Sequence, residues 1–501
     1  MNITELQQSY ASHPNVEGVC RLLKDNSVRH LYCGGLYASA ASLFSSVLVQ
    51  RATCPLVFIL GDMEEAGYFY HDLTQILGTE QVLFFPSSFR RAIKYGQKDA
   101  ANEILRTEVL SRLQKGEEGL CVVTYSDALA EKVVSRKELG ENTLKLHAGE
   151  RVDMNFVTDV LRSYGFEYVD YVYEPGQYAV RGSIIDVFSF SSEYPFRIDF
   201  FGDEVESVRT FEVETQLSKE KKESIVIVPD LSHSLEKKGS GGMVSFLDFL
   251  PSDSLLAMRD FLWLRERIQT VHDESLTPQA IAARESEENG AITLEGKLID
   301  GGEFTLRALD FRRMEFGNKP TGTPDATVSF HTTVQPIFHK NFDMVAESFR
   351  EYLSRHYTIY ICSDSLKQTD RIRAIFEDRG DNISFTAVER TLHEGFADDT
   401  LRICIFTDHQ LFDRFHKYNL KSDKARSGKV ALSLKELNQF TPGDYVVHTD
   451  HGVGRFAGLV RIPNGDTTQE VMKIVYQNED VVFVSIHSLH KVSKYKGKEG
   501  E

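Results

Sequence analysis

Residues 175–209 read PGQYAVRGSIIDVFSFSSEYPFRIDFFGDEVESVR, and the rest of the chain can be interpreted outward from them. Apolar residues alternate over short runs in this stretch, and turn-forming pairs interrupt it at Pro175-Gly176, Ser191-Ser192 and Gly202-Asp203. A period of two that is broken by glycine, proline and serine predicts an antiparallel meander rather than a helix. We therefore expect a small sheet in the middle of the chain.

The run from Phe196 to Phe201 predicts a surface as well as a strand. Alternation places Ile198 and Phe200 on one face and leaves Arg197, Asp199 and Phe201 on the other. An arginine beside an exposed aromatic is typical of an interface anchor, because the guanidinium makes forked hydrogen bonds and the ring supplies rigid apolar area. The alternative is an edge strand with a solvated Arg-Asp pair and a second core beneath Phe201.

This stretch resembles the small inserted domain shared by the nucleotide-excision-repair protein UvrB and the bacterial transcription-repair coupling factors. The resemblance rests on an arginine before Gly-x-x-x-Asp, a second arginine in the following strand and an aromatic four residues further on, here Arg181, Arg197 and Phe201. In that family the insert docks onto UvrA, so the resemblance implies that these three residues bind UvrA. The nearby carboxylates Asp203, Glu204 and Glu206 surround the next turn and are interpreted as a solvated rim rather than catalytic acids.

Length, charge and cysteine content restrict the class of protein to which the chain can belong. The 501 residues are 41% hydrophobic, which predicts about three to five compact units. A net charge of -17 argues against a chain that wraps duplex DNA and favours protein partners. Six scattered cysteines without C-x-x-C predict buried free thiols in a reducing compartment. Because no secretory pattern or long apolar stretch is present, we expect a cytoplasmic protein without a membrane segment.

From His30 to about Val134, short apolar runs alternate with helical periods, which predicts a parallel sheet with crossover helices. We interpret this as an α/β domain of the nucleotide-binding type that occupies residues 1–143 and is completed by residues 229–316. The insert then occupies residues 144–228, and its charged end, SKEKKES, is predicted to be a surface loop.

The first strand-to-helix turn falls where a phosphate-binding loop would lie. The working form is G-x-x-x-x-G-K-[ST], but the four corresponding residues here are Gly35, Ala40, Ala41 and Ser42. A methyl group cannot neutralise phosphate, so we interpret the turn as a degenerate P-loop; the alternative is an ordinary packed helix start. Both predict no nucleotide hydrolysis. The chain offers no nucleophile-base pair, and we expect no catalytic residue, metal or cofactor in it.

The later part of the chain divides at two candidate linkers. Gly317–Ala326 is rich in proline and glycine, and Lys421–Val430 is charged. Between them, residues 327–420 alternate strand and helix patterns and predict a second small α/β domain that serves as a spacer. No motif in this domain carries chemistry.

The last block, within residues 431–496, contains five short β-rich runs closed by turns and predicts a small β-barrel. The sequences DYVVH, ending at His448, and HGVGRF, ending at Phe456, resemble the RNA-polymerase-interacting domain, CarD/Tudor-like, that coupling factors share with the CarD regulators. The resemblance implies addition of an edge strand to the polymerase β subunit. Our candidate edge is EVMKIVY, with Met472 and Ile474 as anchors and Arg455 or Phe456 facing the partner. His448 and His451 are three residues apart, but a turn role is favoured over zinc binding.

The insert, the degenerate loop and the barrel occur in this order in the coupling factors. The resemblance therefore implies an adaptor that binds RNA polymerase and recruits UvrA, acts as a monomer and contacts no membrane. Family members continue into two helicase-type motor domains; because this sequence ends at Glu501, we expect the motor, its ATP and Mg²⁺, and most DNA contact to be missing. The alternatives are a UvrB-type damage-verifying ATPase and a CarD-like transcription regulator in which only the barrel matters.

Overall fold

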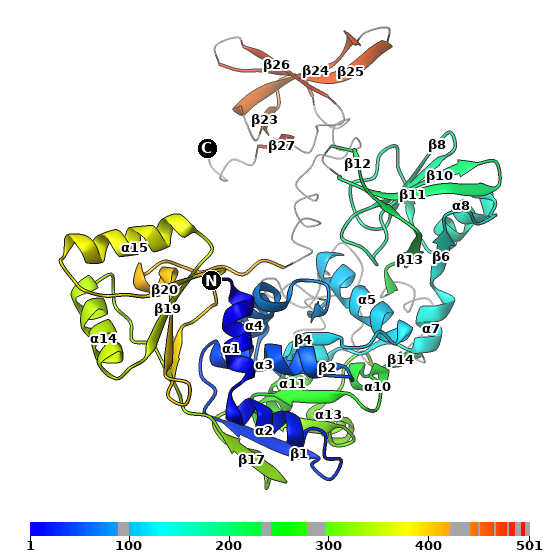
Figure 1. Cartoon of the computed structure of the whole chain (residues 1–501). Coiled ribbons are helices and arrows are strands. Elements are labelled where there is room, and N and C mark those ends of the chain that lie inside the picture. Colours follow the sequence, from blue (N-terminus) through cyan, green and yellow to red (C-terminus); the bar gives the residue numbers. More distant parts are fainter. Residues whose placement is uncertain are drawn as a thin grey trace. The chain divides into compact units, whose positions relative to one another are not determined.

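The computed structural model in Figure 1 describes residues 1–88, 100–213, 215–231, 242–277, 296–420, 441–448, 451–464, 467–477, 480–485 and 492–495. The chain divides into two compact units. One contains residues 1–136 and 239–420, and the other contains residues 137–238 and 421–501.

A seven-stranded parallel sheet forms the centre of the first unit. Its order is β17 (Ala326–Ser329), β1 (His30–Gly34), β16 (Arg312–Glu315), β15 (Leu255–Met258), β2 (Leu56–Leu60), β4 (Cys121–Tyr125) and β3 (Val82–Phe85). Strands β2 and β4 are buried throughout, as the apolar sequences LVFIL and CVVTY predict for parallel strands covered on both faces. Strands β15 and β16 follow the insert in sequence, yet they lie between β1 and β2.

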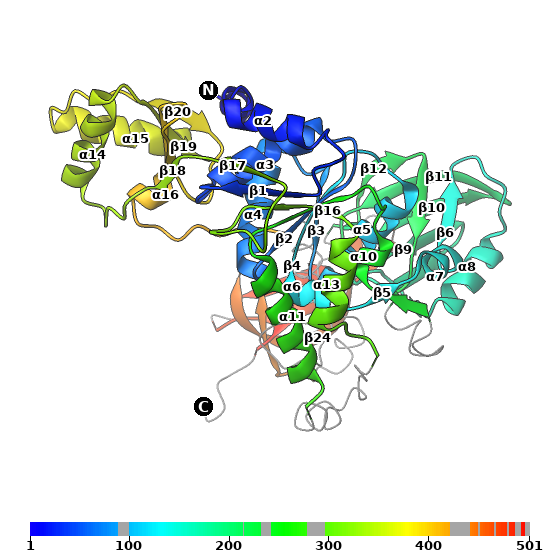
Figure 2. The same ribbon diagram turned by 90° about the horizontal axis from the view of Figure 1, so that it is seen from below.

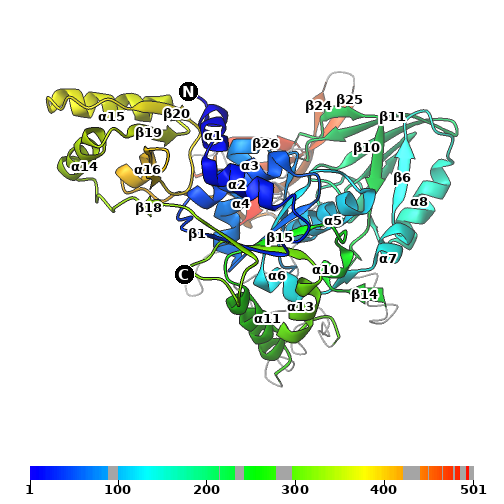
Figure 3. The ribbon, with the colours of Figure 1, turned by 60° about the horizontal axis from the view of Figure 1, so that its bottom comes forward.

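Helices cover both faces of this sheet (Figures 2 and 3). The helices on one face are α1 (Ile3–Ala11), α2 (Pro14–Leu22), α3 (Ala40–Arg51) and α4 (Met63–Leu77), and those on the other are α6 (Ser126–Ala130), α10 (Phe246–Phe249), α11 (Phe261–Ser275) and α13 (Gly301–Leu309). Helix α5 (Ala100–Lys115) packs on β3, and β5 (Val133–Val134) pairs with β14 (Met243–Val244). Asp62 and Asp260 cap α4 and α11 by accepting backbone N–H groups.

The second α/β block of this unit contains a five-stranded sheet. Its order is β18 (Thr332–Val334), β21 (Phe396–Asp398), β22 (Ile403–Thr407), β19 (Thr358–Ser363) and β20 (Thr386–Glu389). The first three strands are antiparallel, and β22, β19 and β20 are parallel. Helices α14 (Phe342–Ser354), α15 (Leu366–Asp378) and α16 (Asp408–Leu411) complete the block, and its core includes Phe349, Ile361 and Phe406.

The predicted linker Gly317–Ala326 is an ordered connection. The Asp325 carboxylate accepts the backbone N–H groups of Arg29 and His30 at 2.9 and 2.8 Å, and Glu315 accepts that of Thr321 at 2.9 Å. The strand that follows, β17, pairs with β1. The sequence that begins the predicted small domain, from residue 327, therefore lies in the large sheet. The hydrogen bonds of Asp325 and Glu315 order the connection in spite of its prolines and glycines.

Buried contacts fix the small block, predicted as a spacer, to the large sheet. The hydroxyl of Tyr10, on α1, donates to Asp398 at 3.0 Å, and His13 lies 3.3 Å from the same carboxylate. On α4, Tyr68 stacks on His393 with ring centroids 3.5 Å apart and donates to the carbonyl of His416 at 2.6 Å. The two sheets are consequently parts of one unit.

The insert contains a six-stranded sheet in the order β12 (Ser218–Lys222), β11 (Glu204–Phe211), β10 (Phe196–Phe201), β9 (Ile184–Val187), β8 (Gln177–Arg181) and β7 (Glu167–Tyr168). All pairs are antiparallel except β7 with β8, so the predicted meander is present. The prediction of a surface loop at SKEKKES is wrong, since five of its residues form edge strand β12; alternate charged side chains at a sheet edge remain solvated.

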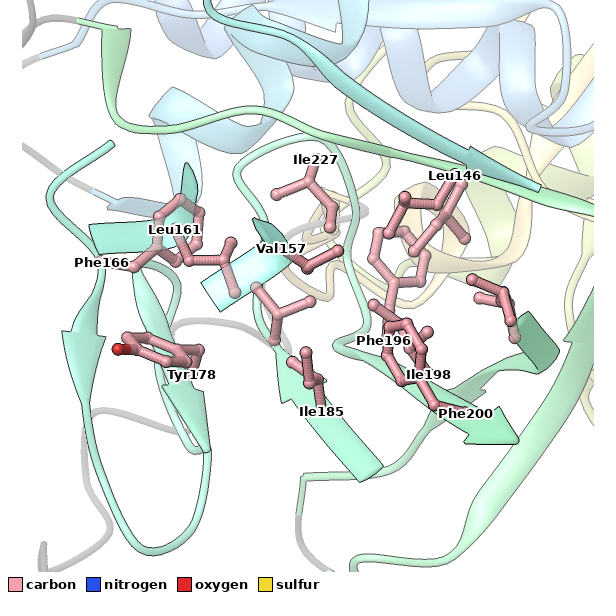
Figure 4. Close-up of a cluster of buried hydrophobic side chains, with 14 residues drawn as sticks. Leu146, Val157, Leu161, Phe166, Tyr178, Ile185, Phe196, Ile198, Phe200 and Ile227 are labelled. Atoms are coloured by element: carbon pink, nitrogen blue, oxygen red, sulfur yellow. The ribbon is translucent and has the colours of Figure 1, made fainter. Parts of the chain in front are cut away.

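Helix α8 (Met154–Ser163) packs on the inner face of this sheet (Figure 4). Its residues Val157 and Leu161 lie in one buried cluster with Ile185, Ile198 and Phe200. Strands β6 (Leu144–His147) and β13 (Ser224–Ile227) pair antiparallel and add further apolar side chains to the cluster. Helix α7 (Arg136–Glu141) precedes them in sequence. One face of the sheet is thus buried, which fixes the strand register.

The terminal block is an antiparallel sheet in the order β26 (Val481–Ser485), β25 (Thr467–Val475), β24 (Gly452–Asn464), β23 (Tyr445–His448) and β27 (Val492–Lys494). Among the described residues β26 and β27 do not pair, so closure into a barrel stays a prediction. The predicted connector Lys421–Val430 lies outside the described residues, as do residues 465–466 and 478–479 of the predicted turns.

Four of the cysteines, Cys33, Cys121, Cys362 and Cys404, are buried free thiols, whereas Cys20 and Cys54 are free but partly exposed. In the described ranges, no helix combines the length and the apolar character needed to cross a bilayer.

Candidate protein-binding surfaces

Two tight hairpins bring Arg181 and Phe201 to the same end of the insert sheet. Arg181 pairs with Ile184 across the turn Gly182-Ser183, and Phe201 pairs with Glu204 across Gly202-Asp203. The first residue of each turn is a glycine with φ of +61°, which glycine adopts without steric cost. Because Phe200 N–H donates to the Ser183 carbonyl at 2.9 Å, the two turns lie side by side.

The alternation predicted for β10 is confirmed. Ile198 and Phe200 are buried in the core, whereas the Phe201 side chain is 79% exposed. That exposure excludes the alternative of a second core beneath Phe201. The register between β10 and β11 shifts at Asp199 and Phe200, which inserts one extra residue in β11 and lets both Val205 and Val208 point inward. Phe201 therefore lies at the end of the sheet with its aromatic ring exposed to solvent.

Asp186, on β9, joins the two predicted arginines. It is directly opposite Arg197 in the register, and its buried carboxylate accepts two hydrogen bonds from that guanidinium, from Nε at 2.8 Å and from Nη2 at 2.9 Å. Arg181 Nη2 also pairs with this carboxylate. The Arg197 guanidinium covers the Phe211 ring at 4.5 Å, and Arg181 covers Tyr171 at 5.0 Å. Sequence reasoning placed Asp186 in the motif but gave it no role.

A third arginine on this face was missed from sequence. Arg209, on β11, is directly opposite Arg197 and pairs with Asp199, which also accepts the Ser207 hydroxyl at 3.2 Å. The signal was the alternation of β11, which turns Val208 inward and therefore Arg209 outward. The guanidinium groups of Arg181 and Arg209 are each about one third exposed, so an acidic partner surface would complement them.

Other parts of the chain pack closely against the predicted phosphate loop. Gly35 has φ of +78°, and a Cβ there would lie 2.0 Å from the Phe330 carbonyl oxygen. Ala40, Ala41 and Ser42 are buried in the first turn of α3. Just before them, Ser39 N–H donates to the Glu394 carbonyl at 3.3 Å, and Ser39 Oγ accepts Glu394 N–H at 3.0 Å. The residue that precedes the helix is thus bonded to the small block at the place where a phosphate would approach.

Acidic side chains surround this helix start. Ser39 Oγ donates to Asp72 at 2.6 Å, and burial raises the pKa of Asp72 to about 7 in spite of that hydrogen bond. An adjacent cavity of about 340 Å³ is lined by Asp62, Glu64, Glu65, Asp72 and Glu394, with Arg259 as its one cation among the lining residues. Negative lining disfavours a nucleotide triphosphate.

Four histidines meet where α4 contacts the small block: His71, His393, His409 and His416. Burial lowers the pKa of each, to about 4 for His393 and about 3 for His416. The charged neighbours are Asp72, Asp364, Asp408, Glu394 and Arg414. Throughout the described part of the chain, no three His, Cys, Asp or Glu side chains are grouped as a metal site, and this holds for His448 and His451.

The terminal sheet corrects three predicted contacts. Phe456, Met472 and Ile474 lie in its buried core, so their side chains cannot reach a partner from the folded sheet. The prediction that EVMKIVY is an edge is also wrong, because β25 has β24 on one side and β26 on the other. Arg455 is exposed and donates to the Tyr445 hydroxyl at 2.9 Å, and its contact with a partner stays a prediction.

Strand β26 is an edge with exposed apolar side chains. Among the described residues it pairs only with β25, and Val481 and Phe483 are 41% and 49% exposed while Val484 is buried. Both β25 and β26 are rich in β-branched residues, so composition could not tell the central strand from the edge.

The domain architecture defines the class of protein. Residues 144–233 match the family described as the UvrB interaction domain, and residues 440–496 match the family described as the CarD-like/TRCF RID domain. The first match contains the face with Arg181, Arg197 and Phe201, and the second contains the terminal sheet. The chain is accordingly a multidomain α/β protein that combines these two domains with a parallel-sheet unit.

Over most of its length the chain is homologous to the transcription-repair coupling factors. It is 22% identical over 545 residues to the transcription-repair-coupling factor of Bacillus subtilis (strain 168) and 23% identical over 530 residues to that of Staphylococcus aureus (strain bovine RF122 / ET3-1). Each alignment covers 93% of this chain and 45% of the relative, so the chain spans less than half the length of these curated relatives.

Proposed function

We propose that this chain is an adaptor of transcription-coupled DNA repair, which binds the RNA polymerase β subunit through its terminal sheet and UvrA through its insert. One observation carries the proposal: an exposed Phe201 beside ordered arginines, in a UvrB interaction domain, on the same chain as a CarD-like/TRCF RID domain. The adaptor works as a monomer in the cytoplasm and has no membrane contact.

The insert supports a partner surface of defined chemistry. Phe201 needs an apolar socket, and Arg181, whose side chain is 36% exposed, needs carboxylate or carbonyl acceptors beside that socket. The two residues are two strands apart, about 10 Å at ordinary strand spacing. UvrA is the partner that the UvrB interaction domain suggests.

For RNA polymerase we propose strand addition at β26 in place of β25. Within the part of the chain that the structure describes, β26 pairs on one side only, so its other edge offers backbone hydrogen bonds, and Val481 and Phe483 provide apolar contacts on one face. Phe483→Asp should abolish polymerase binding. Its control is Phe415→Asp, at an 83% exposed ring in the other unit, which should bind normally.

We further propose that the described part of this chain does not hydrolyse ATP, which disfavours a UvrB-type ATPase. Ala40 and Ala41 replace the glycine and lysine of a phosphate loop, and the Glu394 backbone bonds Ser39 just before the helix. ATP, Mg²⁺ and most DNA contact belong, by this proposal, to the motor domains of complete coupling factors. ATP turnover by the purified chain that is lost in Ser39→Ala would overturn this part.

Co-elution on a sizing column tests the adaptor proposal. The chain should elute with UvrA and, separately, with RNA polymerase; the double variant Arg181→Ala, Arg197→Ala should lose UvrA alone. Polymerase binding without any UvrA binding would favour a CarD-like transcription regulator instead. Loss of both partners in the double variant would mean that the substitutions unfold the chain, and circular dichroism of the same sample controls for that.

A further inference from the structure

We propose that Asp186 and Arg197 form a buried positioning pair that presents Arg181 to the partner. The inference rests on the proposed function of the insert and assigns its residues different tasks. Phe201 and Arg181 touch the partner, Arg197 mainly braces Arg181 through the shared carboxylate, and Asp186 is the residue on which both guanidinium groups converge.

The side chains of Arg181 and Arg197 differ in their exposure to solvent. The Arg181 side chain is 36% exposed, but that of Arg197 is only 14% exposed and that of Asp186 is 1% exposed. Arg197 has further internal partners, since its Nη1 donates to the Gln216 carbonyl at 3.1 Å and its guanidinium covers Phe211. A side chain so enclosed has little surface left for a second protein.

The sheet register brings the three groups together. Asp186 is directly opposite Ala179 on β8 and Arg197 on β10, so Arg181 is its diagonal neighbour, within reach of a long side chain. Arg197 approaches the carboxylate as a bidentate fork, the geometry that a guanidinium matches best. Arg181 joins at Oδ2, the oxygen that Arg197 Nη2 also uses.

A buried carboxylate in this position has two consequences for binding. It restricts the rotamers of Arg181 before the partner arrives, so less side-chain entropy is lost on association. It also offsets like charges, because Arg181 and Arg197 both pair with this carboxylate and their guanidinium groups would otherwise repel each other. Removing the carboxylate should therefore weaken binding through Arg181, although Asp186 itself touches no partner.

The test measures UvrA affinity of the full chain by titration. Asp186→Asn should weaken binding about tenfold, and Arg197→Lys, which keeps the charge but loses the fork, should weaken it by a similar factor. In an Arg181→Ala background the same Asp186→Asn change should cost less than about twofold, because it acts through Arg181. Asp199→Asn is the matched control: that carboxylate pairs with Arg209 on the same face and should change affinity less than about threefold.

A second readout does not depend on UvrA. The Arg197 Nε–H signal in ¹⁵N-arginine NMR spectra should exchange slowly with water in the wild type and rapidly in Asp186→Asn, with the β-sheet signals retained. If the wild type fails to bind UvrA, the proposed function is wrong. The spectra still test whether Asp186 holds Arg197 in the positioning pair. The inference is overturned if Asp186→Asn binds like the wild type, if its cost is the same with and without Arg181, or if Arg197 exchange is unchanged.

Discussion

Phe200 and Phe201 are neighbours in sequence with opposite environments, and replacing each by alanine should separate binding from folding. Phe200 lies in the insert core with Ile198 and Val205, whereas Phe201 is 79% exposed at the end of β10. We predict that Phe201→Ala loses UvrA but keeps the fold, and that Phe200→Ala loses stability.

The magnitudes follow from the areas. A phenylalanine ring of about 200 Å² that is 79% exposed can bury about 160 Å² in a partner, which at ~25 cal/mol per Å² sets an upper limit of ~4 kcal/mol. A loss of ~2–4 kcal/mol corresponds to a dissociation constant raised about 30-fold to 1000-fold. The exposed change should cost less than ~0.5 kcal/mol of stability, but truncation of Phe200 should cost ~3–5 kcal/mol.

Isothermal titration with UvrA and pulse proteolysis of the insert in urea measure the two quantities on the same preparations. Phe201→Ala should shift only the first, and Phe200→Ala should shift the unfolding midpoint of the insert. The reasoning is refuted if Phe201→Ala binds UvrA as the wild type does, or if it lowers the unfolding midpoint as much as Phe200→Ala does.

Three further predictions concern the parallel-sheet unit. Buried His393 and His416 have lowered pKa values, about 4 and about 3, so their stabilising contribution is full above about pH 6.5 and lost as pH falls through the folded values. Asp72, with its pKa raised to about 7, has the opposite sign and loses its contribution as pH rises through 7. Replacing both histidines by asparagine should flatten the fall in melting temperature between pH 6.5 and 4, and an unchanged fall would contradict the assignment. Gly35→Ala should lower the melting temperature of this unit, because its Cβ would lie 2.0 Å from the Phe330 carbonyl at positive φ; a neutral effect would be evidence against that close approach. Millimolar Mg-ATP should leave the melting temperature unchanged, since a ligand at 100 times its dissociation constant would add about 2.7 kcal/mol; a clear upward shift would reveal a nucleotide site.

Local periodicity predicted the parts of the fold that depend on neighbouring residues. The apolar runs of β2 and β4 predicted buried parallel strands, and the alternation in β10 placed Phe201 outward. Arg197 lies on the face that the period of two assigned to it, whereas the strand register brings Arg181, predicted from the resemblance, to the same carboxylate.

Strand order and contacts between residues far apart in sequence could not be predicted from local patterns. Composition suits β25 and β26 equally, so only the sheet order shows that Met472 is interior and Phe483 lies on an edge strand. The contact between Tyr10 and Asp398 joins residues 388 positions apart, and no local sequence pattern predicts it. Asp325 likewise orders a connection whose prolines and glycines predicted a linker.

One measurement tests most directly whether a single chain binds UvrA and RNA polymerase at the same time. It is mass photometry of the chain mixed with both partners. We predict a ternary complex from which Phe201→Ala removes only UvrA and Phe483→Asp removes only the polymerase. Mutually exclusive binding of the two partners, or a variant that removes both together, would contradict the adaptor function.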